Sequence, residues 1–566
     1  MDDNCTEKPK KIAYFSMEIA IKNSIKSFSG GLGVLAGDTL KSAADLEIPM
    51  IGITLLNDQG YFKQIINDDG WQEEMPDSYD KSELEEVTTT HTYIGRDKVK
   101  IKAWRYKIKG QSGFTVPVYF LDTDLEENKK EYRYLTGKLY GGDNEYRLMQ
   151  EIILGRGGVN LLNELKCTEI EKYHLNEGHA ALAIIELLSE LKPKPFTLST
   201  KSIKDRADEI REKCIFTTHT PVKAGHDTFS LDLVKRLQPD FPYKLPELIT
   251  DGRLNMSRLA AYFSSNINGV SRKHGEVSAN MFPDYKVNFI TNGVHSPTWT
   301  TKEFQNLFDK YTPHWKEING DLRNALKIPK EKLWSAHQSA KQKLLSYIED
   351  NNGKKLDKDI FTIGFARRFA TYKRPTLLFK NIQKLLDIHK NVGNIQIVYA
   401  GKAHPNDTAG KEKIQEIHNL IKKLEGEIKI VFLENYDMEV GKLITSGVDL
   451  WLNNPIPPKE GSGTSGMKAA HNGIPQISTL DGWWLEGLIS GETGWAIEQR
   501  ETDKDPSQLF EEHANDLYEK LEKEIIPVYY DDRDKWIEIM KKSIAINAPF
   551  FNSNRMLLEY VQKTYL

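Results

Sequence analysis

The sequence predicts an α/β protein made of doubly wound parallel sheets, and two observations support this prediction. Short apolar runs with the character of buried strands, such as Lys11–Ser16 and Ile48–Leu56, alternate with amphipathic segments such as Gly33–Glu47. The same alternation returns along most of the chain, which favours helices on both faces of a parallel sheet. The chain has 566 residues, more than one hydrophobic core serves, so we expect at least two domains.

The first half continues this pattern. Residues 145–165 have the periodicity of a helix, and residues 172–188 have the pattern of a strand end followed by a helix. Residues 213–221 have the pattern of a strand that ends in a loop. The polar, charged segment 346–359 is typical of a loop. We therefore place a domain boundary there, with a first domain at 1–352.

The second half, 353–566, is predicted to form a shorter α/β domain. Helical patterns separate strand-like runs, which are residues 360–368, 395–403, 428–435 and 448–455. Past Pro506 the pattern is mostly helical. The final segment, 556–566, can pack back against the first domain.

Composition and charge exclude several classes of protein. A hydrophobic content of 39% with a mean hydropathy of -0.53 argues against a membrane protein. A net charge of -4 creates no global field for nucleic acid or an anionic membrane. Cys5, Cys167 and Cys214 are far apart and lack zinc spacing, so we expect incidental thiols, a reducing compartment and no metal site. The polar N-terminus lacks a secretory pattern, which predicts a cytoplasmic protein.

Glycines precede a predicted helix in the segment "FSGGLGVLAGD", residues 28–38. Gly31 and Gly33 allow close backbone approach, and the N–H groups of a helix start suit phosphate. The segment does not directly follow a strand and lacks the acid of a nicotinamide site. The alternative is a turn that needs glycine for its shape alone.

A basic turn follows the predicted strand 360–368. Cationic side chains crowd the segment "ARRFATYKRP", with Tyr372 among them: Arg367, Arg368, Lys373 and Arg374. The planar guanidinium groups of arginine and the ammonium group of lysine bind anionic oxygens well. The alternative is a solvated basic turn.

The segment "EGSGTSGMKAAHNG", residues 460–473, begins as a glycine-rich loop and continues as a helix. Met467 and Ala469 break the P-loop pattern, so that interpretation fails. The N–H groups and hydroxyls of residues 462–466 still suit a phosphate. Lys468 lies about one turn into the helix, where a desolvated amine can form a Schiff base with an aldehyde cofactor. The alternative is that Lys468 extends into solvent.

Three further segments, 175–183, 217–227 and 290–299, place His, Asn or Glu beside small residues where strands end. Such polar groups can meet the hydroxyls of a sugar, although lone histidines are more often structural. The chain contains no serine-nucleophile elbow.

Taken together, these segments resemble the α-glucan phosphorylases, the pyridoxal-phosphate enzymes of the glycogen, starch and maltodextrin phosphorylase family. The resemblance runs from about Ile12 to about Gly487, and residues 460–468 resemble the family's cofactor segment. It implies a GT-B fold, with two Rossmann-like doubly wound domains that face a cleft. It also implies reversible phosphorolysis of terminal α-1,4-linked glucose to glucose 1-phosphate with retention, in which the 5'-phosphate of pyridoxal phosphate relays a proton.

The resemblance also implies a role for each matched residue. Lys468 would hold the cofactor and Thr464 its phosphate, while Gly31 and Gly33 would bring N–H groups to the phosphate pair. Arg368 and Lys373 would bind the substrate phosphate. The glucose hydroxyls would be read by Glu460, Ser462, Gly463, Tyr372, Asn292 and His219. The carbonyl of His219 would also face the anomeric carbon.

Departures from the animal and plant pattern place the chain near the compact bacterial and archaeal branch. They are Arg367, Gly461, the pair Ser465-Gly466 and the segment "DGWW", residues 481–484. We expect them to affect acceptor preference more than chemistry. With a strand already starting near Ile12, we expect no control through an N-terminal arm.

Two alternatives stay open. A synthase-like transferase would use a nucleotide sugar and no Schiff-base lysine, and an inactive glucan-binding relative would keep only the fold. The presence of all four expected site residues argues against an inactive relative: Glu460, Arg368, Lys373 and Lys468. The partners implied are the glucan, inorganic phosphate and glucose 1-phosphate, while glucan length, direction and oligomeric state stay open.

Overall fold

The computed structural model describes residues 12–167, 169–191, 200–222, 225–242, 245–498 and 506–566. Two compact units divide the chain. Unit 1 holds the described parts of Met1–Phe62, Pro76–Thr291 and Met556–Leu566, and unit 2 holds Lys63–Met75 and the described parts of Asn292–Arg555. Each unit is an α/β structure, which confirms the predicted class.

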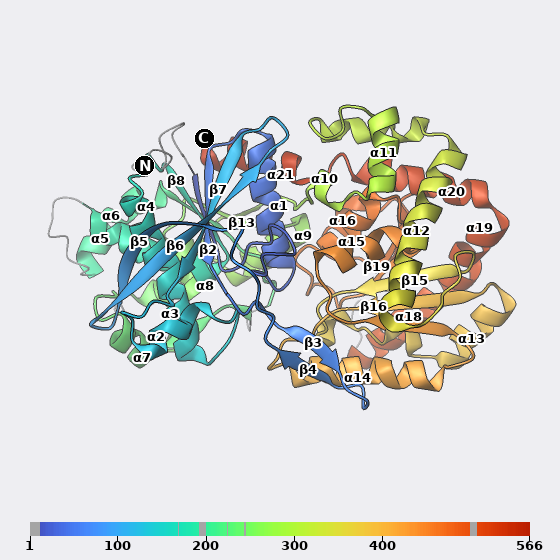
Figure 1. Ribbon diagram of the computed structural model, residues 1–566, viewed down its shortest axis with the longest axis horizontal. Helices are drawn as coiled ribbons and strands as arrows, with labels where there is room; N and C mark the ends of the chain where they lie inside the picture. Colours follow the sequence, from blue (N-terminus) through green and yellow to red (C-terminus); the bar gives the residue numbers. More distant parts are fainter. Residues whose placement is uncertain (1–11, 168, 192–199, 223–224, 243–244, 499–505) are drawn as a thin grey trace. The chain divides into compact units, whose positions relative to one another are not determined.

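Unit 1 is built on a 9-stranded sheet (Figure 1). Its spatial order is β14 (Val287–Phe289), β13 (Asn266–Gly269), β9 (Cys214–Thr217), β8 (Lys172–Asn176), β1 (Ile12–Ser16), β2 (Met50–Leu55), β7 (Thr115–Asp122), β6 (Asp97–Lys109) and β5 (Glu85–Ile94). All strands from β14 to β7 run parallel, and β6 and β5 add an antiparallel edge. The order reverses between β1 and β8, so the loops after these two strands flank a topological switch point.

Helices and a small sheet complete unit 1. The helices are α1 (Gly31–Asp45), α2 (Lys130–Arg133), α3 (Asn144–Ile152), α4 (Gly158–Glu164), α5 (Ala183–Glu190), α6 (Thr200–Arg211), α7 (Leu231–Leu237), α8 (Met256–Tyr262) and α9 (Arg272–Met281). The small sheet joins β10 (Thr228–Ser230), β12 (Arg253–Asn255) and β11 (Ile249–Thr250). Strands β1 and β2 and helix α1 lie within two residues of their predicted bounds, because continuous apolar runs specify buried strands well.

Unit 2 contains a 6-stranded parallel sheet. Its order is β17 (Lys429–Leu433), β16 (Ile395–Ala400), β15 (Phe361–Ala366), β18 (Leu450–Asn453), β19 (Gln476–Thr479) and β20 (Gly494–Ile497). In chain order this is 3-2-1-4-5-6, the order of the doubly wound dinucleotide-binding fold. The switch point therefore lies between β15 and β18, and the loops after those strands are the basic turn and the loop that leads to Lys468.

The helices of unit 2 pack around this sheet. They are α10 (Ser296–Trp299), α11 (Lys302–Tyr311), α12 (Lys330–Asn352), α13 (Ile382–Asn391), α14 (Thr408–Lys423), α15 (Met438–Gly447), α16 (Thr464–His471), α17 (Trp484–Gly487), α18 (Pro506–Lys520), α19 (Ile526–Asp531) and α20 (Arg533–Lys542). Figure 1 also shows the hairpin of β3 (Lys63–Ile66) and β4 (Gln72–Met75) beside α14. Its glutamines anchor it, because Gln64 Nε2 and Gln72 Nε2 each donate to a backbone carbonyl at 2.9 Å.

The division into units differs from the predicted boundary at 352/353. Residues 346–352, expected to be a loop, form the last two turns of α12. Leu344 and Ile348 of this helix share one buried cluster with Val440 and Ile444 of α15. Because that apolar face packs on the second sheet, residues 292–352 lie in unit 2.

The last helix, α21 (Ser553–Tyr560), leads the chain into unit 1. Tyr565 Oη lies 2.6 Å from His174 Nδ1, and Tyr560 Oη lies 3.1 Å from Thr217 Oγ1. The C-terminal segment is thus held in unit 1 by buried hydrogen bonds to residues of β8 and β9.

Two findings bear on the compositional predictions. No helix among the described residues is long and apolar enough to cross a membrane. Cys214 is a buried free thiol, whereas Cys167 is disulfide-bonded, so the expectation of incidental thiols is wrong for Cys167. Cysteine spacing in the sequence does not show which sulfur atoms the fold brings together. Cys5 lies outside the described residues.

Candidate active site

Lys468 lies on α16, just beyond the switch point of unit 2. The helix follows a turn at Gly463, whose φ of 86° is a left-handed conformation that favours glycine. Gly466 is required for a different reason, since a Cβ there would lie 1.6 Å from Gln476 Oε1. The two glycines let the first turn of the helix pack against β19, and its N–H groups lack partners within the helix.

The Lys468 side chain is buried, with 4% of its surface exposed. Its Nζ lies 3.6 Å from the centre of the Trp299 ring, a cation–π contact. Trp299 is itself held, because its carbonyl accepts a hydrogen bond from Asn472 Nδ2 at 2.9 Å. The alternative in which Lys468 extends into solvent is therefore wrong.

The basic turn follows β15, on the other side of the switch point. Arg367, Lys373 and Arg374 are buried, whereas Arg368 is exposed. Arg374 donates to the carbonyls of Asn454 at 2.8 Å and Pro455 at 3.1 Å. These bonds tie the turn to the loop after β18. The solvated-turn alternative holds only for Arg368.

Glu460 joins the two loops electrostatically. Its Oε2 accepts from Arg367 Nη2 at 2.9 Å and also from Lys373 Nζ. Burial raises the pKa of Glu460, but the charges of Arg367 and Lys373 outweigh burial and hold the pKa at about 2. The carboxylate therefore stays ionised at every physiological pH and neutralises part of the cationic turn.

Two serine hydroxyls in the segment after Glu460 have spare hydrogen-bonding capacity. The buried hydroxyls of Ser462 and Ser465 make no hydrogen bond to any other described residue. Tyr372 lies close by, with its ring centre 4.7 Å from Lys373 Nζ. Burial raises the pKa of Tyr372, but the charge of Lys373 contributes to a net lowering. Buried groups of this kind are candidate ligand contacts.

The predicted glycine motif lies at the start of α1 in unit 1. Glu18, which follows β1, accepts the N–H groups of Ser29 at 2.5 Å and Gly30 at 3.2 Å. A Cβ at Gly33 would lie 2.8 Å from Glu18 Oε2, whereas a Cβ at Gly31 would meet no atom within 4 Å. Packing thus accounts for Gly33 but leaves Gly31 unexplained.

His219 follows β9 in unit 1, and its neighbours come from the end of β8. Its backbone N–H donates to Glu177 Oε2 at 2.8 Å, and its Nε2 lies 2.7 Å from Asn176 Oδ1. Burial lowers the pKa of His219 to about 3, so the imidazole is neutral. Glu177 adopts a φ of 74°, unusual for a residue other than glycine. The His219 backbone is therefore fixed by groups at the switch point of unit 1.

The predicted site residues fall into two sets. Gly31, Gly33 and His219 belong to unit 1. Unit 2 holds Lys468, Thr464, Glu460, Ser462, Gly463, Arg368, Lys373, Tyr372 and Asn292. Asn292 is buried, and its Oδ1 makes no hydrogen bond to the described residues.

Three residues that hold these groups were not predicted from the sequence. They are Trp299 beneath Lys468, Glu177 behind His219, and Asp481, which accepts the N–H of Glu460 at 2.8 Å. Each lies in a segment quoted for its pattern. No spacing rule connects any of them with its distant contact.

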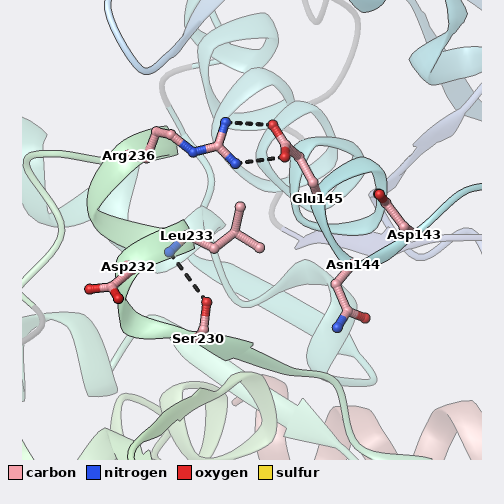
Figure 2. Close-up of a pocket in the computed structure, with 7 residues that line it drawn as sticks. All are labelled: Asp143, Asn144, Glu145, Ser230, Asp232, Leu233 and Arg236. Atoms are coloured by element: carbon pink, nitrogen blue, oxygen red, sulfur yellow. Dashed lines mark hydrogen bonds and ion pairs between the residues drawn. The ribbon is translucent and has the colours of Figure 1, made fainter.

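A surface pocket of about 570 Å³ lies in unit 1, between the first turns of α3 and α7 (Figure 2). Arg236 and Glu145 form a bidentate ion pair across it, with Nη1–Oε1 at 2.7 Å and Nη2–Oε2 at 2.6 Å. None of the predicted site residues lines it. It contributes nothing to the candidate site.

The residues of α16 and its loop fit pyridoxal phosphate. The group carries an aldehyde, which a buried amine such as Lys468 can bind, and a phosphate, which suits the N–H groups of a helix start and nearby hydroxyls. The buried Ser465 hydroxyl, which has no partner among the described residues, is available for this. The donor set therefore matches the chemistry of the cofactor.

The chain is similar in sequence to known carbohydrate phosphorylases. Residues 24–109 and 244–489 match a family model described as carbohydrate phosphorylase. A maltodextrin phosphorylase of Thermococcus litoralis is 38% identical, over 98% of this chain and 70% of the relative. A glycogen phosphorylase of Aquifex aeolicus is 35% identical, over 98% and 86%. A glycogen phosphorylase of Mycobacterium tuberculosis is 33% identical, over 98% and 71%.

Proposed function

The chain belongs to the carbohydrate phosphorylase family, and on that premise we propose that it releases glucose 1-phosphate from an α-1,4-glucan or maltodextrin. It is a phosphorylase, an enzyme of the glycosyltransferase class. Its two α/β units with parallel sheets agree with the GT-B fold of the family. The proposed reaction moves a terminal glucose from the glucan to inorganic phosphate, reversibly and with retention at the anomeric carbon.

The observation that carries this proposal is the burial of Lys468 over Trp299, in a helix whose first turn carries the Ser465 hydroxyl, which makes no hydrogen bond to any other described residue. Burying an amine costs free energy unless a function or a partner compensates. A lysine with this setting suits a covalent bond to pyridoxal phosphate. Lys468 would hold the cofactor, and Thr464 and the first turn of α16 would hold its phosphate. When bound, the cofactor supplies a phosphate that can exchange a proton with the substrate phosphate.

The cations of unit 2 would bind the substrate phosphate. Two phosphates repel each other strongly where water is scarce, so positive charge and N–H donors are physically necessary. We assign Arg368 and Lys373 to the substrate phosphate and the backbone N–H groups of Gly31 and Gly33 to the phosphate pair. The exposure of Arg368 leaves its guanidinium accessible to an incoming anion.

Polar side chains and backbone groups would bind the hydroxyls of the glucose. We assign its 3- and 4-hydroxyls to Glu460, Ser462 and Gly463, its 2-hydroxyl to Tyr372, and its 6-hydroxyl to Asn292 and His219. The backbone carbonyl of His219 would stabilise positive charge at the anomeric carbon. The bonds of His219 to Asn176 and Glu177 support this, because a preorganised dipole needs no rearrangement during the reaction.

The test is release of glucose 1-phosphate from maltodextrin, with and without inorganic phosphate, by protein purified with pyridoxal phosphate. Phosphate-dependent release is the expected result. Release from a nucleotide-sugar donor instead would favour the synthase-like alternative. Bound cofactor without turnover on any glucan would favour the inactive relative. The cytoplasmic location stays a prediction from the sequence, and the oligomeric state stays open.

A further inference from the structure

Asp481 lies buried in the short segment between β19 and α17. Its Oδ2 accepts the backbone N–H of Glu460 at 2.8 Å, and its Oδ1 accepts the N–H of Gly482 at 2.9 Å. Each carboxylate oxygen thus has a backbone donor, and hydrogen bonds to an ionised acceptor are stronger than neutral ones. None of the roles assigned above involves this carboxylate.

The same segment forms a second hydrogen bond to the loop that contains Glu460 and Ser462. The N–H of Trp483 donates to the carbonyl of Ser462 at 2.9 Å. Gly482 makes this approach possible, because a Cβ there would lie 2.4 Å from that carbonyl oxygen, and its φ is 55°. Residues 481–483, which we call the clamp, therefore hold the backbone of Glu460 and of Ser462 together.

Glu460 is consequently held from both ends. The clamp fixes its backbone, while Arg367 and Lys373 fix its carboxylate. The Ser462 hydroxyl, in contrast, is buried and makes no hydrogen bond to any other described residue. The clamp thus orients two polar side chains, the ion-paired Glu460 and Ser462, whose hydroxyl is unpaired among the described residues. Both are proposed to contact glucose.

We propose that Asp481 is a positioning residue for glucan recognition, which holds the loop of Glu460 and Ser462 in the shape that reads the terminal glucose. This inference rests on the proposed function. It assigns Asp481 to the glucan rather than to the substrate phosphate or the cofactor, because among the described residues its carboxylate accepts the N–H groups of Glu460 and Gly482 and none from α16.

The charge around Asp481 makes this role dependent on pH. Burial raises the pKa of Asp481 to about 7, the nearby Glu460 carboxylate acts in the same direction, and its N–H donors and Lys373 act in the opposite one. Protonation turns one oxygen into a donor, so one of the two N–H bonds is lost. Glucan affinity should therefore fall as the pH drops through about 7.

The experiment compares the parent protein with Asp481→Asn, prepared with pyridoxal phosphate. Maltodextrin binding is followed by tryptophan fluorescence between pH 6 and 8, alongside the KM values for maltodextrin and phosphate and the amount of bound cofactor. Asp407→Asn is the matched control, because Asp407 also accepts a backbone N–H, that of Gly410 at 2.9 Å, but does so at the start of α14. Asparagine can accept at only one oxygen.

The expected result for Asp481→Asn at pH 8 is glucan binding weakened about tenfold or more, the equivalent of one lost charge-assisted hydrogen bond. The KM for phosphate and the amount of bound cofactor should change less than about twofold. The fall in glucan affinity below about pH 7 that we expect for the parent protein should be absent in the variant. Asp407→Asn should match the parent throughout. Asp481→Glu, which keeps both acceptors, should recover part of the affinity.

Unchanged glucan binding, an unchanged pH profile, or an equal rise in both KM values would overturn the assignment. Loss of bound cofactor together with a large fall in melting temperature would overturn it too, since the role would then be general stability. A parent protein that binds maltodextrin but releases no glucose 1-phosphate would contradict the proposed function alone. The binding comparison would still decide the role of Asp481.

Discussion

Replacement of Glu460 by glutamine tests the electrostatic account of the site. Glutamine keeps the size of the side chain but removes the negative charge that Arg367 and Lys373 share. Two buried cations are then left without their common anion, which is costly in a region of low dielectric constant. We expect Glu460→Gln to destabilise unit 2 in protein prepared without pyridoxal phosphate.

The magnitude follows from the pKa of Glu460, which is about 2 in the folded protein against an ordinary value of 4.5. The difference corresponds to roughly 3 kcal/mol of stability at neutral pH. Because the folded pKa is depressed, this stability is present above about pH 4.5 and is lost as the pH falls towards 2. The side chain is only 9% exposed, so solvent screens the pairs weakly.

The assay is thermal unfolding between pH 6 and 8, with and without inorganic phosphate. A loss of roughly 3 kcal/mol lowers the melting temperature by roughly 6 to 10 °C in a unit of this size. Glu522→Gln is the control, because Glu522 pairs with Lys384 at 2.7 Å in a half-exposed position, where solvent screens the ion pair and its contribution is smaller. Phosphate should raise the melting temperature of Glu460→Gln more than that of the parent. A melting temperature within 1 °C of the control would refute the reasoning.

Three further predictions concern the cofactor, the phosphate and the helix. Lys468→Ala should abolish both cofactor retention and turnover, checked by absorbance of bound pyridoxal phosphate; full activity without added cofactor would contradict the assignment. Arg368→Ala should raise the KM for phosphate about tenfold or more while the cofactor stays bound, and an unchanged phosphate dependence would move that site elsewhere. Gly466→Ala should lower both the melting temperature and the cofactor retention, because the added Cβ would overlap Gln476 Oε1. Gly320→Ala is the control and should change neither, because its Cβ would meet no atom nearer than 3.7 Å.

Local sequence patterns were enough to predict the central strands of both units, which are β1, β2, β8 and β9 in unit 1 and β15 to β18 in unit 2, but not β5, β6, β7, β13, β14, β19 or β20. Strands such as β1 and β15 are short, continuous apolar runs, which specify buried strands. The boundary between units was less accessible, because α12 carries a charged surface at its C-terminal end and its apolar face is visible only once α15 packs against it. A polar stretch can end a helix or form its outer face, and composition does not distinguish the two.

The residues of the candidate site were predicted from sequence motifs, but the residues that hold them in place, such as Trp299 and Asp481, were not. Lys468 was predicted as a cofactor residue because it lies about one turn after a glycine-rich loop, where a desolvated amine can form a Schiff base. Its contact with Trp299 spans 169 residues of chain, and no periodicity reports such a pairing. The clamp at Asp481 depends on the parallel pairing of β18 with β19, in which Trp451 lies opposite Gln476. That register brings together two loops that the sequence places twenty residues apart.

The switch points explain why the site residues are spread so widely along the sequence. In unit 2 the order of strands reverses between β15 and β18, so the basic turn after one strand meets the loop after the other. Arg374 bridges these two loops through backbone carbonyls, and Glu460 bridges them through charge. A cation on one loop and an anion on the other stabilise each other where water is scarce. Lys373 would then serve both the substrate phosphate and, through Glu460, the glucose. The ion pairs of Glu460 thus bring a proposed glucan contact and a proposed phosphate contact together within unit 2.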